Sequence, residues 1–407
     1  MNGDTRRAVL GRAALALGFI AAGCGGAAPE GDASTVRDSA GIEIVENRRG
    51  AWNGGEHWSI DPIPVIEIAG SPNTPLFNVV GVIRTDDGRT VLANQSSSEL
   101  LVFDATGNFV TALGKEGDGP GEFRDISDIT YCGGDSITVY DRRTLRATVI
   151  TLNGTFLHSF APQSPVRYAS WPRDVTCNAD GTRLVVGWGR TASRDAGPGR
   201  QRPNVPILVL QADSTARAWT LEVPGTELQA WVDPDGNGWW GEAPFARHSS
   251  IVLGGSWIHV ATGDSRQIEQ YEPSGRLVRL VRWTGLSNPV TPADARDFEI
   301  ALLDSIPENR RRLTESLFAR VEYPETMPPY GVVIADDSGY VWVREYARQT
   351  VGDVNWMVFG PDGRELGTVA MPASFAVHEI GQDFALGVAK DESGVEHVLM
   401  YRLNRRP

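Results

Sequence analysis

One short template recurs along this chain: an apolar strand, a turn built on Asp, Asn or Gly, and a second strand that opens with an aromatic residue or Leu. Alternating apolar residues on each side of a glycine turn indicate a β-hairpin. Because the same hairpin returns at intervals, the sequence predicts an all-β repeat protein. Four clear copies and one degenerate copy occur, at residues 99–110, 147–157, 267–278, 356–366 and 206–215.

The spacing of the turn glycines sets the size of the repeat. Gly107 and Gly154 are 47 residues apart, which is close to the length of one four-stranded propeller blade. Gly275 follows after 121 residues and Gly363 after a further 88, so these intervals contain a second period or an insertion. A second element, two strands joined by an Asp/Gly turn, precedes the hairpins and completes each blade. It occurs, for example, at residues 82–92, 175–184 and 332–343.

The two ends of the repeat region complete each other. The last inner element, residues 375–389, is followed only by a strand at 397–403 and therefore lacks a fourth strand. An unassigned strand at residues 64–69 precedes the first blade. A ring closes when an N-terminal strand completes the C-terminal blade, because closure removes the exposed strand edges. The predicted fold is all-β: a six-bladed β-propeller whose last blade is closed by an N-terminal strand.

One segment, at about residues 291–327, breaks the strand pattern. Thr291, Pro292 and Asp294 form a helix start, with a capping hydroxyl and a proline in the first turn. Apolar residues then recur at fourfold spacing, which predicts a short helical insertion of two amphipathic helices. We expect their apolar faces to lie on one end of the propeller as a lid or brace; a partner-binding surface is the alternative. These residues are Phe298, Leu302, Leu313, Leu317 and Val321.

The first residues have the features of an export signal. The pair Arg6-Arg7 leads into residues 13–22, an apolar run too short to span a bilayer, and small residues then precede Cys24. This arrangement resembles the bacterial lipobox, in which the cysteine is acylated and becomes the mature N-terminus. Ala21 departs from the pattern, because Leu is usual there, and an ordinary cleaved signal is the alternative. The arginine pair also resembles the twin-arginine pattern, so both export routes stay open.

These features divide the chain into three parts. Residues 1–23 are the predicted signal peptide, residues 24–40 a flexible tether, and residues 41–407 the propeller with its insertion. Acylated Cys24 supplies two lipid chains, which suffice for stable anchoring in a lipid bilayer. The sequence therefore predicts an exported lipoprotein of the cell envelope, anchored to a membrane and facing its extracytoplasmic side.

A glycine-rich segment follows the outer strand of the first predicted blade. Residues 114–123 read Gly-Lys-Glu-Gly-Asp-Gly-Pro-Gly-Glu-Phe. The glycines permit a tight path from an outer strand to the next inner strand, and we expect Phe123 to drop back between two sheets. This segment resembles the blade-linking signature of NHL-type propellers.

The wider pattern extends that resemblance. Residues 244–247, 279–283 and 323–330 look like the corresponding segments of the bacterial six-bladed β-propeller lipoproteins. The similarity spans roughly residues 40–405. It implies a fold and a cellular location but no activity, because a fold alone does not determine function.

Six-bladed propellers include enzymes, so channel residues are candidates for catalysis. His248 and His378 open inner-strand elements, and Arg247 and Glu379 adjoin them. If both pairs face the channel, they resemble a streptogramin-lyase site; ordinary polar residues lining a wet channel are the alternative. Gluconolactonase-like relatives hold a channel metal, but no His-x-His or His-Glu-x-x-His spacing occurs here. The sequence therefore predicts no cofactor.

One loop has the oxygen pattern of a calcium site. Asp233, Asp235 and Asn237 alternate along the chain. The bidentate Glu that completes a calcium loop is missing at the expected offset. These three residues are candidate ligands, while the sequence as a whole favours the absence of a metal.

The charge balance limits the possible partners. With 51 acidic and 38 basic residues, the formal net charge is −13. This argues against nucleic acid, which is bound through clustered Lys and Arg. The predicted function is a membrane-anchored binding or interaction module, expected to be a monomer, whose ligand is an unidentified protein, peptide or glycan. A channel-centred lyase or lactonase is the alternative.

Two cysteines remain once Cys24 is acylated. Cys132 and Cys177 end the same inner-strand element of successive blades, displaced by one residue. An even remainder in an exported protein, on strands that lie side by side, predicts a Cys132–Cys177 disulfide. The displacement opposes this, because a strand reverses its side-chain face at each step; a bulge is expected to restore the facing. Two buried free thiols are the alternative.

Overall fold

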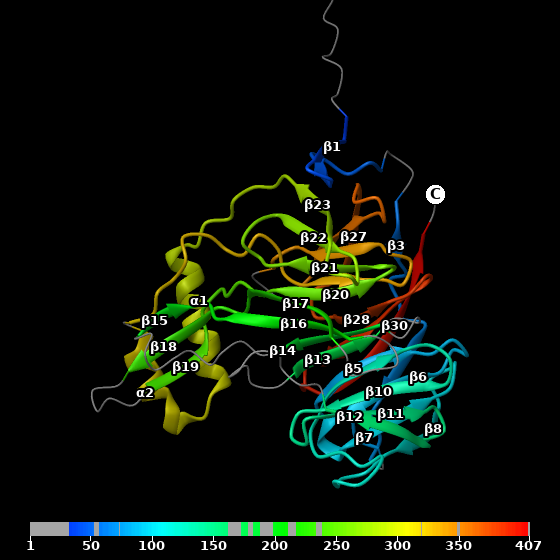
Figure 1. Cartoon of the computed structure of the whole chain (residues 1–407). Coiled ribbons are helices and arrows are strands. Elements are labelled where there is room, and N and C mark those ends of the chain that lie inside the picture. The colour runs from blue at the N-terminus through cyan, green and yellow to red at the C-terminus, as the bar shows by residue number, and fades with distance from the viewer. Residues whose placement is uncertain are drawn as a thin grey trace, which may run out of the picture. The chain divides into compact units, whose positions relative to one another are not determined.

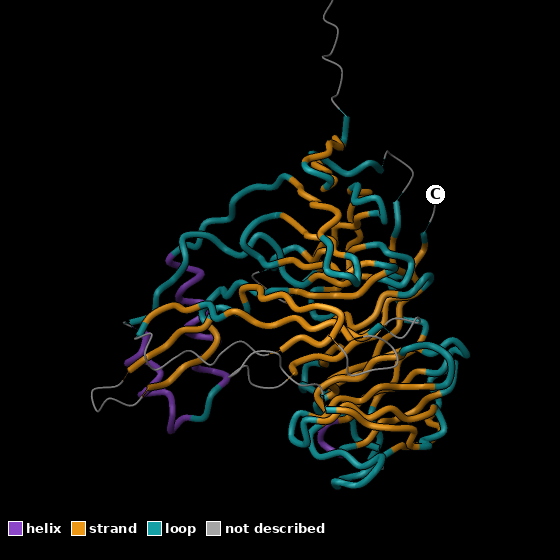
Figure 2. Tube along the Cα trace, in the orientation of Figure 1, coloured by secondary structure: helices purple, strands orange, loops and turns teal. Residues whose placement is uncertain are grey.

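Strands dominate the computed structural model of this protein (Figure 2). It describes residues 32–52, 57–72, 74–161, 172–177, 182–187, 198–210, 217–232, 238–318, 320–347 and 351–405. The chain divides into the units Met1–Asp32 and Ala33–Pro407, and the second contains all the helices and strands of the described ranges. Of the helices in the described ranges, none is long and apolar enough to cross a membrane.

Six sheets form the blades, and within each blade the repeat strands are antiparallel and ordered from the inner to the outer strand (Figure 1). Blade 1 consists of β5 (Val79–Arg84), β6 (Thr90–Asn94), β7 (Glu99–Phe103) and β8 (Phe109–Leu113). Blade 2 consists of β9 (Ile126–Tyr131), β10 (Ser136–Asp141), β11 (Arg146–Thr151) and β12 (Phe156–Phe160). Blade 3 consists of β13 (Pro172–Cys177), β14 (Arg183–Gly187), β16 (Asn204–Leu210) and β17 (Arg217–Pro224). Blade 4 consists of β20 (Ser250–Gly254), β21 (Trp257–Ala261), β22 (Gln267–Tyr271) and β23 (Leu277–Trp283). Blade 5 consists of β24 (Val333–Ala335), β25 (Val341–Arg344), β26 (Asp353–Phe359) and β27 (Glu365–Pro372). Blade 6 contains β28 (Ala376–Ile380), β29 (Phe384–Lys390) and β30 (Glu396–Asn404). These strands confirm the elements predicted from the repeats.

The six blades close into a ring. Inner strands of successive blades contact one another, β14 contacts β20 where blade 3 meets blade 4, and β28 contacts β5 where the last blade meets the first. Each of the six seams between adjacent blades holds one apolar cluster. The blades therefore follow one another around the ring in sequence order, and blade 2 lies opposite blade 5. The predicted six-bladed propeller is confirmed.

An N-terminal strand completes blade 6, as the sequence predicts. β4 (Ile66–Ala69) pairs antiparallel with β30, and the two-residue β3 (Ser59–Ile60) pairs with the end of the same strand. Ile66 and Ile68 are buried between blades 6 and 1, whereas Glu67 is exposed. This alternation is the period-2 pattern of a half-buried strand. Blade 6 thus combines the two ends of the propeller.

Residues 34–52 run along the outer edges of blades 4 and 5. β1 (Ser34–Ser39) and β2 (Ile42–Asn47) form a hairpin, and β2 pairs in parallel with β23. The buried Asn47 side chain accepts a hydrogen bond from the backbone N–H of Glu365, which ties this hairpin to blade 5. The tether predicted at residues 24–40 is therefore corrected at its end: from Ser34 the chain is a strand, because the hairpin extends blade 4.

The turn glycines are required by both conformation and space. Gly107 and Gly363 have positive φ angles of 87° and 80°. A Cβ on Gly107 would lie 3.0 Å from Ile66 of blade 6, and one on Gly363 would lie 2.8 Å from Val281 of blade 4. Each turn packs against the outer part of the preceding blade, which explains why glycine recurs at this point of the repeat.

The crossover from blade 1 to blade 2 has the predicted structure. Phe123 is fully buried in the seam between these blades. A Cβ on Gly114 would lie 2.6 Å from the Phe123 ring, and the Phe123 N–H donates to the Lys115 carbonyl at 2.9 Å. The glycine therefore lets the chain fold tightly over the aromatic ring that fills the seam.

A side sheet, which the sequence does not predict, accompanies blades 3 and 4. It consists of β15 (Gly199–Gln201), β18 (Leu228–Val232) and β19 (Gly238–Glu242). β15 is inserted between β14 and β16, and β18 and β19 between β17 and β20. In an antiparallel blade, the connections from strand 2 to 3 and from strand 4 to the next blade leave at the same end. The helical insertion, between β23 and β24, leaves at this end as well.

Two helices form the insertion, as predicted. α1 (Pro292–Ser305) begins at a capping box of Thr291 and Asp294, and α2 (Glu308–Phe318) follows. The Phe298 ring lies 5.6 Å from Phe245, between β19 and β20, so α1 braces the crossover into blade 4. Backbone hydrogen bonds from Val290 to Glu325 and from Met327 to Asn288 close the base of the insertion.

Candidate functional site

The inner strands of all six blades line a central channel. It encloses a cavity of about 380 Å³, with residues of β5, β9, β13, β20, β24 and β28 in its wall. Pockets for small molecules typically measure about 300–1,000 Å³ and place a few polar groups within an apolar wall. The channel has this composition, because aliphatic side chains alternate with carboxyl, hydroxyl and imidazole groups. It is therefore the candidate functional site.

Three carboxyl groups belong to the channel wall. Asp128 comes from β9, Asp337 follows β24, and Glu379 lies in β28 beside His378. None of the described residues that line the cavity is a Lys or Arg. These three groups therefore add negative charge to the described part of the wall when they are ionised.

A bulge sets the position of two of these carboxyl groups. In β28, Val377 pairs with Gly387 and Glu379 with Leu386, so His378 is the extra residue of a β-bulge. β9 has the same irregularity one residue before Asp128. A bulge re-aims the side chains next to it and is common beside binding sites. His378 and Glu379 are candidate residues in the sequence whereas Asp128 is not, although an alignment of the inner strands of blades 2 and 6 reveals the shared position.

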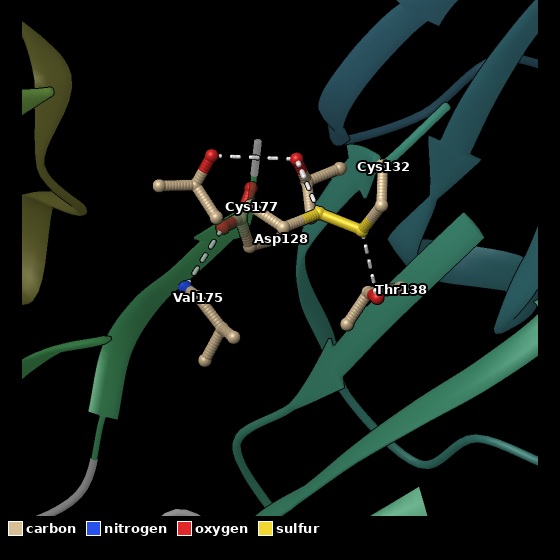
Figure 3. Close-up of a disulfide and its surroundings, with 7 residues drawn as sticks. Asp128, Cys132, Thr138, Val175 and Cys177 are labelled. Carbon is tan, nitrogen blue, oxygen red and sulfur yellow. Dashed lines mark hydrogen bonds between the residues drawn. A yellow bond between two sulfur atoms is a disulfide. The ribbon is translucent and has the colours of Figure 1, made fainter. Parts of the chain in front are cut away.

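Both carboxylates bond to the backbone of the next blade. Glu379 Oε2 accepts from the Arg84 N–H of blade 1 at 2.7 Å. Asp128 Oδ2 accepts from the Val175 N–H of blade 3 at 3.2 Å (Figure 3). The same strand position thus joins two different pairs of neighbouring blades.

Burial shifts the protonation of the channel groups. It raises the pKa of Glu379 to about 8, against the opposing hydrogen bond from Arg84 and with a further rise from the charge of Asp337. Burial also raises the pKa of Asp337, assisted by the charges of Asp336 and Asp86, and lowers the pKa of His378. The lumen reaches these side chains, but protein surrounds them and weakens the hydration of their charged forms.

Asp336, next to Asp337, has a structural role. Its Oδ1 accepts from the Tyr340 N–H at 2.9 Å, and its Oδ2 pairs with Arg405 at 2.6 Å. This confirms the turn cap typical of Asp in such hairpins. Asp337, which is not among the site residues predicted from the sequence, faces the channel instead.

Arg247 and His248 lie elsewhere. Arg247 pairs with the buried Glu227 and with Asp264, and His248 Nε2 lies 3.3 Å from Glu242 Oε1. Neither is among the described residues of the channel wall. The expectation that both pairs face the channel is corrected for Arg247 and His248, because they precede β20 and are engaged by the side-sheet crossover.

Glu227 anchors the side sheet. Arg200 of β15 donates to it at 2.7 Å, and Arg247 donates to its other oxygen. Burial alone would raise the pKa of Glu227, but the hydrogen bonds from Arg247 and Arg200 lower it to about 2. This carboxylate therefore stays ionised and holds the crossover in place.

The disulfide predicted from the sequence is present. Cys132 and Cys177 are bonded, with their Cα atoms 5.4 Å apart, and join blades 2 and 3 at the channel (Figure 3). The bulges in β9 and β13 fall at equivalent positions, so they do not correct the displacement between the two cysteines. Instead, Cys132 lies just past the end of β9 and is freed from the alternation of the strand.

The remaining candidates concern metal and lipid. Asp233, Asp235, Asn237 and Cys24 lie outside the described residues. Within the described ranges, no three His, Cys, Asp or Glu side chains are grouped so that they could hold a metal ion. A second hollow of about 560 Å³, between blade 4 and the base of the insertion, is more open than the channel.

Comparison with known proteins supports the fold. Residues 71–153 match a family described as a 6-bladed beta-propeller. No curated protein matches this chain. The family match covers the whole of blade 1 and most of blade 2, and it agrees with the propeller expected from the sequence.

Solved structures of propeller proteins are similar to this chain. A protein from Bacteroides fragilis described as exported has 11% sequence identity, with 89% of this chain and 100% of that chain covered and a TM-score of 0.50. A member of the duf4221 family from Bacteroides vulgatus has 10% identity, with coverages of 87% and 100% and a TM-score of 0.45. A streptogramin B lyase has 11% identity, with coverages of 85% and 97% and a TM-score of 0.41. At these identities, the likeness concerns the fold alone.

Proposed function

We propose that this chain is an exported, membrane-anchored binding protein whose ligand occupies the central channel. One observation carries the proposal: all six blades contribute to a cavity of about 380 Å³ that combines aliphatic side chains with convergent polar groups. Such a site orients a small molecule or the end of a larger one through a few hydrogen bonds.

Bonds between the inner strands of neighbouring blades support a preorganised site. The disulfide joins the inner strands of blades 2 and 3, and Glu379 bonds to the inner strand of blade 1. Rigid walls reduce the entropy lost when a ligand binds. The channel is therefore suited to recognition by fixed groups on strands rather than by mobile loops.

A channel-filling substitution tests this proposal. Thr176 belongs to the wall, and its hydroxyl lies 3.3 Å from that of Thr130. We expect Thr176→Trp to block the cavity, while Thr111→Trp, on the exposed strand β8, leaves it open. Ligand-observed NMR with the full chain would use amines, amino acids, dipeptides and disaccharides as probes. At least one class should bind the parent and Thr111→Trp but not Thr176→Trp; equal binding to all three proteins refutes a channel site.

Anchoring is tested separately at Cys24. Mass spectrometry of protein extracted from membranes should show a mature chain that starts at diacylated Cys24. The variant Cys24→Ala should leave the membrane fraction, because a chain without the lipid lacks the anchor. A Cys24→Ala variant that stays as firmly bound as the parent refutes the lipoprotein assignment.

A lyase or lactonase is the second candidate function. It is favoured by Glu379, which has a pKa of about 8 and lies beside His378 in the channel. A carboxyl group that keeps its proton near neutral pH is suited to act as a general acid. Turnover of a panel of lactones by the parent, lost in Glu379→Gln, is the expected result for this function; no turnover of any substrate by the parent excludes these substrates.

A further inference from the structure

We infer that this chain has a second binding site, for a sugar that carries a carboxylate, in the hollow between blade 4 and the base of the helical insertion. This site is separate from the channel and does not depend on the function proposed for the channel. Three features of the hollow support it: the charge of its wall, the way in which one arginine is held there, and the hydroxyl and amide groups around that arginine.

Three connections of the chain form the hollow, which has a volume of about 560 Å³. They are the turn between β21 and β22, the segment after β23, and the segment that leads from the insertion to β24. The volume is within the range of about 300–1,000 Å³ that is typical of sites for small molecules. Because the hollow opens at the surface, a monosaccharide or the end unit of a longer glycan fits its form.

The wall of the hollow carries more positive than negative charge. Its described residues include Arg266 and Arg282, and among them Asp264 is the only acidic one. The charge of Asp264 is already balanced, because its Oδ1 accepts from Arg202 at 2.6 Å and from Arg247 at 2.9 Å. The two arginines of the wall therefore make this hollow a positive site in a chain whose formal net charge is −13.

Arg266 is fixed in place without a carboxylate. Its guanidinium donates to the Leu286 carbonyl at 2.5 Å, and no acidic partner of Arg266 is found among the described residues. Gly285 makes this position possible, because a Cβ there would clash with Arg266 Nε. A guanidinium carries five N–H donors, so Arg266 keeps donors for a ligand while one of them holds it in position.

Arg282 brings a second guanidinium to the same wall. It lies opposite Gln267 in the pairing of β22 with β23, and its Nε donates to the Gln267 side-chain oxygen at 2.8 Å. Its nearest carboxylate, Glu46, lies 3.7 Å away and also pairs with Arg37 at 3.3 Å. Exposed ion pairs of this kind contribute little. Arg282 is therefore able to engage an anion in the hollow without losing a strong partner.

The rest of the wall suits a sugar rather than a small inorganic anion. Hydroxyl and amide side chains surround the arginines, namely Ser265, Gln267, Thr284, Ser287, Asn288 and Thr326. Such groups both donate to and accept from the hydroxyl groups of a sugar, while a guanidinium binds a carboxylate through two parallel hydrogen bonds. Met327 and Pro329 add apolar surface for the C–H groups of a sugar ring. A uronic acid combines all three requirements.

Ligand-observed NMR titrations on the full chain at low salt test the inference with four probes. These are D-glucuronate, D-glucose without the charge, acetate without the sugar, and D-glucose 6-phosphate with a different anion. We expect glucuronate to bind about tenfold or more tighter than each of the other three. Glucose or acetate binding as tightly as glucuronate, or no binding of glucuronate, would refute the site. Glucose 6-phosphate binding as tightly would refute the preference for a carboxylate.

Two variants test the part played by Arg266. Arg266→Gln removes the charge, and Gly285→Ala keeps the charge but displaces the guanidinium. Both should weaken glucuronate binding about tenfold or more. Arg276→Gln is the matched control, because it removes an exposed arginine from the β22–β23 turn, at the other end of the same blade. It should bind glucuronate as the parent does, and parental binding in all three variants would refute the role of Arg266.

Two further variants complete the test. Thermal unfolding shows whether each variant is folded, and Arg282→Gln examines the same wall if Arg266→Gln does not fold. Thr176→Trp, which fills the channel, should bind glucuronate as the parent does. Loss of glucuronate binding in Thr176→Trp together with parental binding in Arg282→Gln would place the sugar in the channel and refute the second site.

Discussion

The ring is held differently at two of its seams. Between blades 6 and 1, β4 from the N-terminal part adds to β30, and the described residues of this seam include twelve buried apolar side chains. Between blades 2 and 3, a disulfide joins the inner strands, and the described apolar cluster contains six residues. The covalent lock therefore lies at the seam with the smaller described core.

The closing strand β4 and the disulfide stabilise the ring by acting on different states of the chain. β4 stabilises the folded ring by burying Ile66 and Ile68, and its pairing bridges more than three hundred residues, as Ile66 lies opposite Met400. The disulfide spans a sequence separation of 45 residues and acts mainly by restricting the unfolded chain. A ring needs every seam, and the seam with the smaller described apolar cluster carries the constraint that does not depend on burial.

Removing the closing strand should have the largest effect on this comparison. A chain that starts at Ser71 lacks β4 and exposes the edge of β30 and the apolar surface of both neighbouring blades. We expect aggregation or loss of a cooperative thermal transition, because an uncovered edge pairs with other chains. A chain that starts at residue 49 removes only the β1–β2 hairpin and should still melt cooperatively. A cooperative transition at the parental temperature in the shorter chain would show that β4 is dispensable.

Breaking the disulfide should destabilise the protein less than removing β4. The entropic treatment of a loop of this length gives about 4 kcal/mol, and measured losses are often smaller. We expect Cys132→Ser/Cys177→Ser to lower the free energy of unfolding by about 3–4 kcal/mol in guanidinium denaturation. Unreduced, denatured parent protein should show no reactive thiol at these two positions. An unchanged free energy of unfolding in the double variant would mean that the seam between blades 2 and 3 is stable without the bond.

Truncating a single buried side chain of β4 should destabilise the protein slightly less than loss of the disulfide. Ile68 is 2% exposed in the seam between blades 6 and 1. We expect Ile68→Ala to destabilise the protein by about 3 kcal/mol through lost burial and the cavity that remains. Glu67→Ala, on the exposed face of the same strand, is the matched control and should change stability by about 0.5 kcal/mol or less. Equal losses at both positions would contradict the alternation that places Ile68 inside.

The closure of the ring by β4 was predictable from the sequence because its signals are local. Strand alternation and the glycine turns of the repeat leave one strand over at the start and one missing at the end. The bond between Cys132 and Cys177 was also predictable, but its geometry was not, since the end of β9 lies one residue earlier than the alternation argument requires.

The channel site was only half predictable. Glu379 and His378 stood out as an ionisable pair at the start of an inner element, whereas Asp128 resembles the many turn-capping aspartates of the sequence. The prediction that Arg247 and His248 face the channel was wrong because β18 and β19 are inserted before β20, and these two residues contact that insertion instead of joining the inner strand. The side sheet itself combines strands from two separate connections, and periodicity within one segment does not reveal such pairing.

The smallest expected effect compares the two seams through their carboxylates. In the folded protein the pKa of Glu379 is about 8, above its ordinary value of 4.5. A carboxyl whose pKa is raised on folding contributes stability that is complete at low pH and is lost as the pH rises through 8, because ionisation is then favoured in the unfolded chain. Glu379→Gln keeps an oxygen that accepts from the Arg84 N–H and removes the ionisation.

The melting temperature of Glu379→Gln relative to the parent should therefore increase between pH 6.5 and pH 9. Asp128→Asn makes the same chemical change at the equivalent position of the disulfide-linked seam. An equal pH dependence in both variants would assign the effect to the strand position that blades 2 and 6 share rather than to the surroundings of Glu379. A difference between Glu379→Gln and the parent that stays constant with pH would show that Glu379 does not titrate in this range. The seam between blades 6 and 1 would then owe nothing of its pH dependence to this carboxyl group.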